Sequence, residues 1–277
     1  MREEISRLRD YVAKKIAPTH DLLNLKMLKG ADRKSPTGYA DSHAVQTRTQ
    51  HQATRTRHQA VTAKVVQATE ILKQYLAETS YRYGNVGCGH EATINLNEHL
   101  TDTFPGHTFH WVGLDVSQKT IEIAVNMLEE KKREAEEKAS RINIQFKVFD
   151  IFNLLDEFDP QQIPLYPWHL AVIAGVLHNY NDSECALFLK ATKRCLQKNG
   201  LLVLGEAAYE SYSSFKRFIL TKFVIPIQMY QSYRVGFGVK FHYRKYEGFR
   251  AIISNAGLEI IEYELVNPNH IFLLRNK

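Results

Sequence analysis

The chain has 277 residues, of which 44% are apolar and 24% are charged, so it is long enough to bury one large core. Its longest uncharged apolar run, residues 170–177, is far shorter than the roughly 20 residues that a membrane-spanning helix needs. The N-terminus lacks the apolar stretch of a secretory signal, and the three cysteines have no CxxC spacing, so we expect a cytoplasmic protein with reduced thiols and no metal site.

The net charge of +6 lies entirely in the N-terminal part of the chain. Residues 1–80 hold 14 Lys and Arg against 8 Asp and Glu (14 − 8 = +6), whereas residues 81–277 hold 22 of each (22 − 22 = 0). A basic segment can attract nucleic acid, acidic lipid or an anionic substrate, or it can be the solvated face of helices. We favour the solvated helical surface, because such an excess is ordinary.

The N-terminal residues carry helical patterns. Residues 3–29 place apolar side chains at helical spacing, and Pro18 is expected to divide them into two pieces. Residues 30–42 are rich in Gly, Ser, Asp and Pro and predict a loop, whereas residues 43–80 lack Gly and Pro and predict one or two helices. We therefore expect a helical unit over residues 1–79.

From residue 80 onward, short apolar runs alternate with segments of helical length. Five strands are predicted, in YRYGNVGCG, TFHWVGLDVS, INIQFKVFDIF, HLAVIAGVLHN and GLLVLGEAAY. Helices are expected over 118–141 and 183–196, the second with a capping box from Asn181 and an end at Asn199-Gly200. The C-terminal segment predicts helix, glycine stop, strand, turn and strand. This alternation favours an α/β fold with a doubly wound, mostly parallel, Rossmann-like sheet over residues 80–277.

The first three predicted strands each end in residues suited to a nucleoside. Gly87 and Gly89 form a glycine turn, which is either a plain tight turn or a close approach for a ligand next to a helix N-terminus. Asp115 ends the second strand, where a carboxylate can accept hydrogen bonds from ribose hydroxyls. Asp150 ends the third strand beside two apolar residues, and together these features predict an adenosine-bearing ligand.

Six segments, taken in order, resemble the class I S-adenosylmethionine-dependent methyltransferases over about residues 80–277. They are NVGCGHEAT, VGLDVS, FKVFDIF, VLHNYND, LQKNGLLVLGE and NAGLEIIE. The resemblance is closest to small-molecule O-methyltransferases of the caffeate and hydroxyneurosporene type, without their winged-helix dimerisation domain. An NAD-dependent enzyme fits less well, because Glu91 occupies the place of the third glycine.

The resemblance implies S-adenosylmethionine as cofactor, with S-adenosylhomocysteine as product. The residues that match the family's cofactor site are Asn85, Gly87, Gly89, Glu91, Asp115, Val116, Asp150, Ile151, Phe152 and Gly175. Asn85 stands where the family usually has an acid for the methionine ammonium group. Glu91 either supplies that charge from the first helical turn or points to solvent.

The same resemblance assigns a general base to His178 and an orienting carboxylate to Glu206. A phenol has a pKa near 10, so it needs a base at neutral pH, and imidazole titrates in a suitable range. This scheme requires no metal. The alternatives are a histidine that packs under the cofactor or caps the next turn, and a glutamate that forms a local salt bridge.

Methyltransferases of this class usually cover the site with N-terminal helices, so we expect the helical unit over 1–79 to act as a lid above a small-molecule acceptor. Aromatic residues after the fifth strand either line the acceptor pocket or pack in the core; they are Tyr209, Tyr212, Phe215, Phe218 and Phe223. An RNA or protein methyltransferase is an alternative that the basic N-terminal segment leaves open, although residues 178–181 lack the prolines typical of enzymes that grip a flipped base. A non-catalytic protein with this fold is the third alternative.

Overall fold

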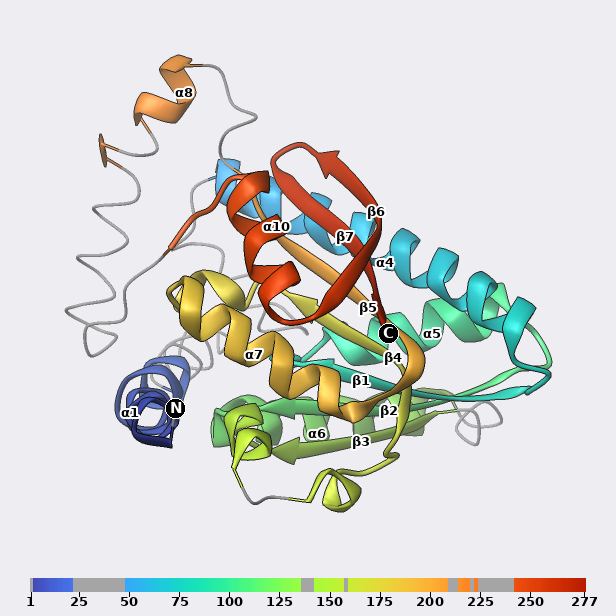
Figure 1. Cartoon of the computed structure of the whole chain (residues 1–277). Coiled ribbons are helices and arrows are strands. Elements are labelled where there is room, and N and C mark those ends of the chain that lie inside the picture. Colours follow the sequence, from blue (N-terminus) through green and yellow to red (C-terminus); the bar gives the residue numbers. More distant parts are fainter. Residues whose placement is uncertain are drawn as a thin grey trace.

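The structure is a computed structural model that describes residues 2–21, 48–135, 142–156, 159–208, 214–219, 222–223 and 242–277 (Figure 1). Its centre is a seven-stranded sheet with the order β3-β2-β1-β4-β5-β7-β6. The strands are β1 (Ser80–Val86), β2 (Thr108–Asp115), β3 (Asn143–Val148), β4 (Trp168–Ala174), β5 (Leu196–Ala207), β6 (Leu258–Val266) and β7 (Asn269–Asn276).

Strands β1 to β5 pair in parallel, and β7 runs antiparallel between β5 and β6. The chain reverses direction across the sheet at β1, which pairs with β2 on one side and β4 on the other. An open parallel sheet binds its ligand at the carboxyl edge beside such a reversal. The predicted doubly wound, mostly parallel fold is confirmed.

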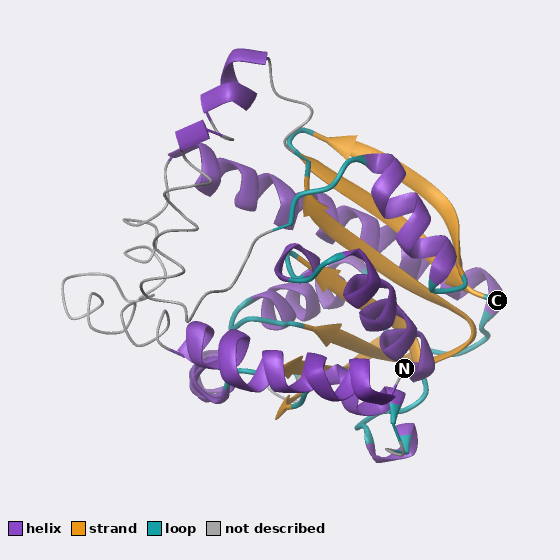
Figure 2. Cartoon of the chain, turned by 60° about the vertical axis from the view of Figure 1, so that its left-hand side comes forward, coloured by secondary structure: helices purple, strands orange, loops and turns teal. Residues whose placement is uncertain are grey.

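Helices cover both faces of the sheet (Figure 2). They are α1 (Arg2–Tyr11), α4 (Arg48–Tyr75), α5 (Ala92–Thr103), α6 (Gln118–Ala135), α7 (Asp182–Cys195), α8 (Ser214–Ile219) and α10 (Tyr246–Asn255). One hydrophobic cluster joins α1, α7 and α10 to the sheet, and a second joins α4, α5 and α6 to it. The two clusters correspond to the two faces, which is why strands such as β4 are apolar along almost their whole length.

The N-terminal helix does not break at Pro18, contrary to the prediction. A π-helical turn, η1 (Val12–Ile16), follows α1, and residues 17–21 continue the helix. In that turn the N–H of Ala17 donates to the carbonyl of Val12, five residues back. The wider turn lies directly before the proline, which has no N–H to donate, and it lets the helix continue past the ring.

Helix α4 is one continuous helix of 28 residues, and its C-terminal half packs on the sheet. Val61, Val65, Ala68 and Leu72 are buried along one stripe at helical spacing. The helix approaches β5 closely because position 205 is glycine: a Cβ there would lie 2.4 Å from Val61 Cγ2. Within the described ranges, no helix combines the length and the apolar character needed to cross a membrane.

Helix α7 begins as the sequence predicts but ends earlier. The capping box is present: the Asn181 side chain accepts from the Glu184 N–H, and the Glu184 side chain accepts from the Asn181 N–H. The helix stops at Cys195, so Asn199-Gly200 does not end it. Asn199 instead has a φ of 61° inside β5, where the pairing with β4 shifts between Trp168 and Leu170. Asn tolerates this left-handed backbone, and the pair therefore forms a bulge in the strand.

The C-terminal elements match the prediction. Helix α10 ends before Gly257, which has a φ of 71°, and the two antiparallel strands β6 and β7 follow. The helix predicted over 118–141 is observed as α6 up to Ala135, and residues 136–141 lie outside the described residues, as does the loop predicted over 30–42. The predicted unit boundary between residues 79 and 80 stays a prediction.

Candidate functional site

A cavity of about 380 Å³ lies at the carboxyl ends of β1, β2 and β4. Its wall includes nine of the twelve predicted site residues: Asn85, Gly87, Gly89, Glu91, Asp115, Val116, Asp150, Ile151 and Gly175. Phe152, His178 and Glu206 do not line it. The volume lies within the range of small-molecule sites, which are usually clefts of about 300–1,000 Å³.

The glycine turn after β1 requires glycine at two positions. Gly87 and Gly89 have φ values of 70° and 58°, in the left-handed region that residues with a Cβ rarely adopt. A Cβ at Gly87 would also lie 2.4 Å from Val176 Cγ2, on the loop after β4. The turn is followed by α5, which directs its N-terminal N–H groups toward the same edge of the sheet.

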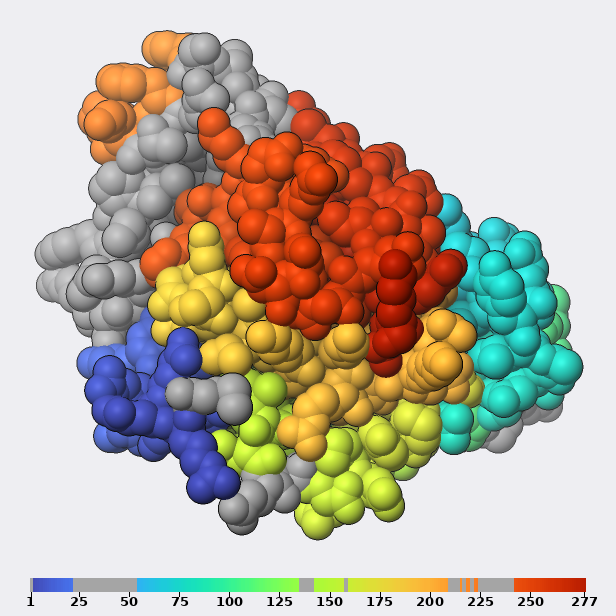
Figure 3. Space-filling model, viewed as in Figure 1, coloured from blue at the N-terminus to red at the C-terminus, as the bar shows by residue number. Residues whose placement is uncertain are grey.

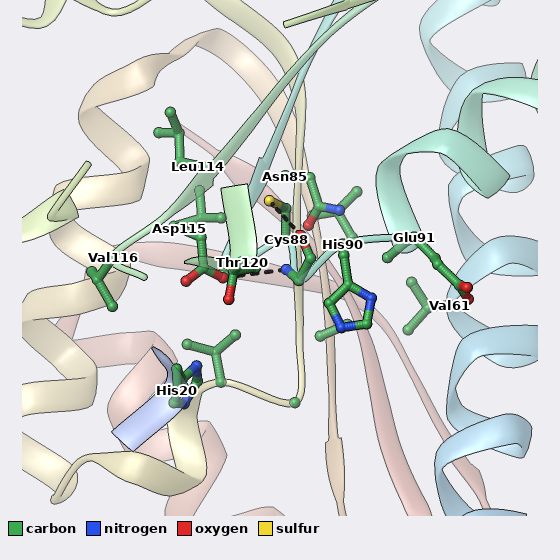
Figure 4. Close-up of a pocket in the computed structure, with 18 of the residues that line it drawn as sticks. His20, Val61, Asn85, Cys88, His90, Glu91, Leu114, Asp115, Val116 and Thr120 are labelled. Atoms are coloured by element: carbon green, nitrogen blue, oxygen red, sulfur yellow. Dashed lines mark hydrogen bonds between the residues drawn. The ribbon is translucent and has the colours of Figure 1, made fainter. Parts of the chain in front are cut away.

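Asp115 is buried at the end of β2 and is fixed by backbone donors. Its carboxylate accepts from the N–H groups of Ser117 at 3.0 Å and Gly89 at 3.3 Å. Burial raises the pKa of Asp115, while the charge of His20 and the backbone donors oppose that rise. Figure 4 shows Asp115 and His20 on the same side of the cavity.

Asp150 follows β3 and begins a short 3-10 turn, η4 (Ile151–Leu155), by accepting from the Phe152 N–H at 3.0 Å. Burial raises its pKa to about 6, and this N–H and the charge of Arg9 oppose the rise. Ile151 lines the cavity beside it. Phe152 is instead fully buried behind the wall, where it packs edge-on against Tyr180 and Phe188.

Asn85 and Glu91 flank the turn on its other side. The Asn85 amide is buried and donates to Thr93 Oγ1 at 3.0 Å, so the residue is anchored by α5. Figure 4 shows Glu91 on the opposite side of the turn from Asp115, toward Val61 of α4. Burial raises the pKa of Glu91, and Lys131 opposes the rise. Glu91 lines the cavity, and its role toward an ammonium group stays a prediction.

Glu206 organises the loop after β4. Its carboxylate is buried at the end of β5 and accepts from the N–H groups of Val176 and Leu177, both at 2.6 Å, and from His178 Nδ1 at 3.3 Å. Burial raises the pKa of Glu206, but the hydrogen bond and charge of His178 and the charge of Arg57 hold it below its usual value. An ionised Glu206 keeps the proton of a neutral His178 on Nδ1, so Nε2 is the nitrogen that can accept a proton.

The His178 ring does not line the cavity. It stacks on Tyr243 with ring centroids 6.3 Å apart, and its side chain is 23% exposed. Its neighbours Val176, Asn179 and Tyr180 do line the cavity. The short 3-10 turn η6 (Leu177–Asn179) turns the His178 side chain toward Glu206, and this geometry brings the two predicted catalytic residues together.

Arg244 also holds the loop between β4 and α7. This arginine was not predicted from the sequence as a site residue. Its guanidinium donates to the carbonyl oxygens of Leu177 and Tyr180 and to the Asp182 carboxylate. The backbone N–H of His242 also donates to the His178 carbonyl oxygen at 2.6 Å. The Arg244 side chain is nearly buried, whereas Asp182 is exposed. Because an exposed ion pair contributes little, the bonds to the backbone carbonyl oxygens are the contacts that hold the loop.

Two N-terminal segments supply residues of the cavity wall that were not named individually from the sequence. Ile16 and His20 both line the cavity, and Figure 4 shows His20 on the Asp115 side. The carboxylate of Asp21 accepts from Ser117 Oγ at 2.6 Å and from the Lys119 N–H at 3.0 Å, which fastens the segment to the start of α6. In Figure 3 the N-terminal residues (blue) lie against the body of the molecule, and near α7 they share a small surface cavity with Asn181 and Glu184.

The second segment is the start of the described part of α4, where Thr54, Arg57, His58 and Val61 line the cavity. Arg57 precedes the buried stripe 61–65–68–72 by one helical turn. That spacing was the one available signal that an arginine side chain would face the sheet.

The aromatic residues predicted after β5 do not line this cavity. Phe215, Phe218 and Phe223 have exposed side chains, so neither core packing nor a place in the cavity wall is observed for them. Tyr209 and Tyr212 lie outside the described residues.

No protein-family model matches the chain, and no curated protein matches it. A magnesium protoporphyrin IX methyltransferase from Synechocystis PCC 6803 with bound SAH aligns with a TM-score of 0.54 and 15% identity, over 91% of this chain and 99% of that one. The mitomycin 7-O-methyltransferase aligns with a TM-score of 0.51 and 17% identity, over 94% of this chain and 69% of that one.

A third solved structure, a SAM-dependent methyltransferase from Methanosarcina mazei, aligns with a TM-score of 0.50 and 15% identity, over 74% of this chain and 96% of that one. At these identities the likeness concerns the fold. The chain therefore has the fold of the class I S-adenosylmethionine-dependent methyltransferases.

Proposed function

We propose that this protein transfers the methyl group of S-adenosylmethionine to a small-molecule acceptor. The acceptor atom attacks the methyl carbon in line with the sulfur, the carbon–sulfur bond breaks, and S-adenosylhomocysteine leaves. The observation that carries the proposal is the cavity that brings the glycine turn, Asp115 and Asp150 to one edge of the sheet. Structures with this fold that hold SAH or SAM support the same cofactor here.

The proposed cofactor site uses these residues in order along the sheet. Asp115 would accept hydrogen bonds from the ribose hydroxyls, and Asp150 would accept one from the adenine amino group beside Ile151. The glycine turn leaves room for the sulfonium end, and the remaining predicted cofactor residues flank it. Phe152 supports this site from behind the wall.

The finer part of the proposal is that the acceptor atom is a hydroxyl oxygen and that His178 is its base. The contact between Glu206 and His178 Nδ1 supports this role, because it directs Nε2 to accept the hydroxyl proton as the carbon–oxygen bond forms. His178 does not line the cavity, so this role requires the hydroxyl to approach it from the part of the cavity lined by Val176 and Asn179.

We also propose that residues 1–79 form the cover of the site in a cytoplasmic enzyme. The wall residues Ile16 and His20, and those at the start of α4, support this role because they close the cavity from outside the sheet. Such a cover excludes water from the reacting groups.

Binding of S-adenosylhomocysteine, measured by titration calorimetry, tests the cofactor part. Wild-type protein is expected to bind it, and Asp115→Ala is expected to weaken binding by about 10- to 100-fold, because a charged acceptor of ribose hydrogen bonds is lost. A wild-type protein that binds neither SAM nor SAH would contradict the proposal.

Transfer of a labelled methyl group to caffeate, used as a hydroxyl probe, tests the role of His178. We expect His178→Ala to lower kcat by about 10²–10⁴-fold and to leave the SAH affinity unchanged, because a base acts only in the reaction step. Glu206→Gln should lower kcat less. The exposed His99→Ala on α5 is the matched control. Parallel loss of turnover and SAH binding in His178→Ala would identify a structural residue.

A further inference from the structure

Arg57 is the one permanently charged cation among the described residues of the cavity wall. It extends from α4 over the ends of β4 and β5, and the glycine at the end of β4 makes room for its guanidinium. A Cβ at Gly175 would lie 2.6 Å from Arg57 Nη2, and a Cβ at Gly205 would lie 3.5 Å from Arg57 Cγ. The aliphatic stem therefore lies over β5 and the guanidinium lies over the end of β4.

The guanidinium is not neutralised by a partner within the described part of the chain. Its Nε is buried and has no hydrogen-bond partner there. Glu206 is the acid whose pKa Arg57 lowers, but the two form no ion pair. The oxygens of Glu206 already accept from Val176, Leu177 and His178. A buried donor without an acceptor is unfavourable, and more so when the group is charged, so a ligand that supplies an acceptor would be stabilised here.

Two of the three acidic residues of the wall, Asp115 and Asp150, lie at the other end of the cavity, whereas Glu91 lies on the α4 side of the turn and forms no hydrogen bond or ion pair with Arg57 among the described residues. Asp115 and Asp150 follow β2 and β3, whereas Arg57 covers the ends of β4 and β5, on the opposite side of β1. A ligand that donates hydrogen bonds at one end and carries an anionic group at the other would match this arrangement. A planar guanidinium is suited to a carboxylate, which can accept two parallel hydrogen bonds from it.

We propose that Arg57 binds a carboxylate inside this cavity, either that of the amino-acid end of the cofactor or that of the methyl acceptor. The inference takes the identity of the cofactor from the proposed function. The carboxylate site itself rests on the guanidinium, on Gly175 and on the Nε that has no hydrogen-bond partner among the described residues.

The first arm of the test removes the carboxylate from the nucleoside. Calorimetry compares S-adenosylhomocysteine with 5′-methylthioadenosine, which lacks the amino-acid group, on wild type, Arg57→Gln and Arg57→Lys. If the cofactor supplies the carboxylate, Arg57→Gln weakens S-adenosylhomocysteine by about 10- to 100-fold and leaves 5′-methylthioadenosine unchanged. Arg57→Lys keeps the positive charge but lacks the planar guanidinium, so the loss of S-adenosylhomocysteine affinity is smaller than in Arg57→Gln. Arg55→Gln, an exposed position on the same helix, leaves both affinities unchanged.

The second arm offers a carboxylate that is not part of the nucleoside. Benzoate and benzamide are titrated into the protein with and without saturating S-adenosylhomocysteine, while the Arg57 Nε–H resonance is followed by NMR. If the acceptor supplies the carboxylate, benzoate shifts this resonance and benzamide does not. Arg57→Gln then loses benzoate binding measured by calorimetry, and Arg55→Gln keeps it.

A positive result in either arm supports the proposal and identifies the source of the carboxylate. Two combined results overturn the proposed carboxylate site. The first is that Arg57→Gln weakens both nucleosides equally, or weakens neither. The second, required together with the first, is that benzoate causes no response. If Arg57→Gln fails to fold, Arg57→Lys carries both comparisons. A wild-type protein that binds neither nucleoside contradicts the proposed function instead, and the benzoate titration without nucleoside still decides whether Arg57 binds a carboxylate.

Discussion

Asp150 illustrates how burial in the cavity wall changes the chemistry of a single residue. Its pKa is raised from the ordinary value of 3.8 to about 6, mainly by burial, because the Phe152 N–H and the charge of Arg9 only partly offset the lost solvation. Without a ligand, the carboxylate at neutral pH is therefore less stable in the folded state than in the unfolded chain. A ligand donor such as an amino group would relieve that cost.

The stability of the protein without ligand should reflect this pKa. The folded state binds the Asp150 proton more tightly, so the contribution is fully present below about pH 4 and is lost as the pH rises through 6. Asp150→Asn does not titrate, and its stability relative to wild type should rise between pH 4 and 7 by at most about 3 kcal/mol. Urea unfolding at several pH values measures this difference. A difference that is constant with pH would contradict the raised pKa.

At the scale of elements, the loop between β4 and α7 is held by two residues that come later in the chain, Glu206 and Arg244. Glu206 satisfies the N–H groups at its start, and Arg244 satisfies the carbonyl groups of Leu177 and Tyr180. The loop is thus held from β5 on one side and from the segment before α10 on the other. His178 lies between these two anchors, so its position depends on residues far away in the sequence.

Replacement of Arg244 should loosen this loop. Arg244→Ala removes the charged donor from the carbonyl oxygens of Leu177 and Tyr180, which keep only weaker donors such as the Cys185 thiol, and we expect a loss of about 1–3 kcal/mol in unfolding free energy. We also expect kcat to fall more than SAH affinity, because the loop carries His178 rather than Asp115 or Asp150. Chemical denaturation and kinetics measure the two effects. Arg250→Ala, at an exposed position on α10, is the control, and equal effects of both variants would contradict the assigned contacts.

At the scale of the whole molecule, the cavity joins distant parts of the chain. Asp21 lies 96 positions from Ser117 and 98 from Lys119, yet it accepts from both at the start of α6. This contact holds the N-terminal segment, which carries His20, against the Asp115 side of the cavity. A carboxylate at a helix N-terminus satisfies donors that would otherwise have no acceptor.

Loss of this contact should open the N-terminal segment. Asp21→Ala is expected to lower the unfolding free energy by about 1 kcal/mol and to increase hydrogen exchange in residues 2–21. SAH affinity should fall as well, because His20 and Ile16 belong to the wall. Asp10→Ala, which removes an exposed pair with Lys14, is the control. Unchanged exchange in Asp21→Ala would show that the apolar contacts of α1 alone hold the segment.

Local patterns predicted most of the sheet domain, because a buried parallel strand has a continuous apolar run and a ligand edge has its glycines and acids at strand ends. They failed at Pro18, where a π-helical turn lets the helix continue past the proline. They also failed at Asn199, where a left-handed residue lies inside a strand and does not end a helix. They also missed Arg57 and Arg244, whose partners are remote in the sequence. The glycines at 175 and 205 acquire their meaning only when α4 is placed against them.

The strand order also has a consequence for synthesis. A chain that has emerged from the ribosome only as far as residue 148 contains β1, β2 and β3, which are neighbours in the sheet, but not β4. One side of β1 is then without its strand, and an open strand edge is a template for pairing with other chains. The strand that adds the β4 side of the cavity is thus also the one that closes this edge of β1, and the open edge then passes to β4 until β5 pairs with it.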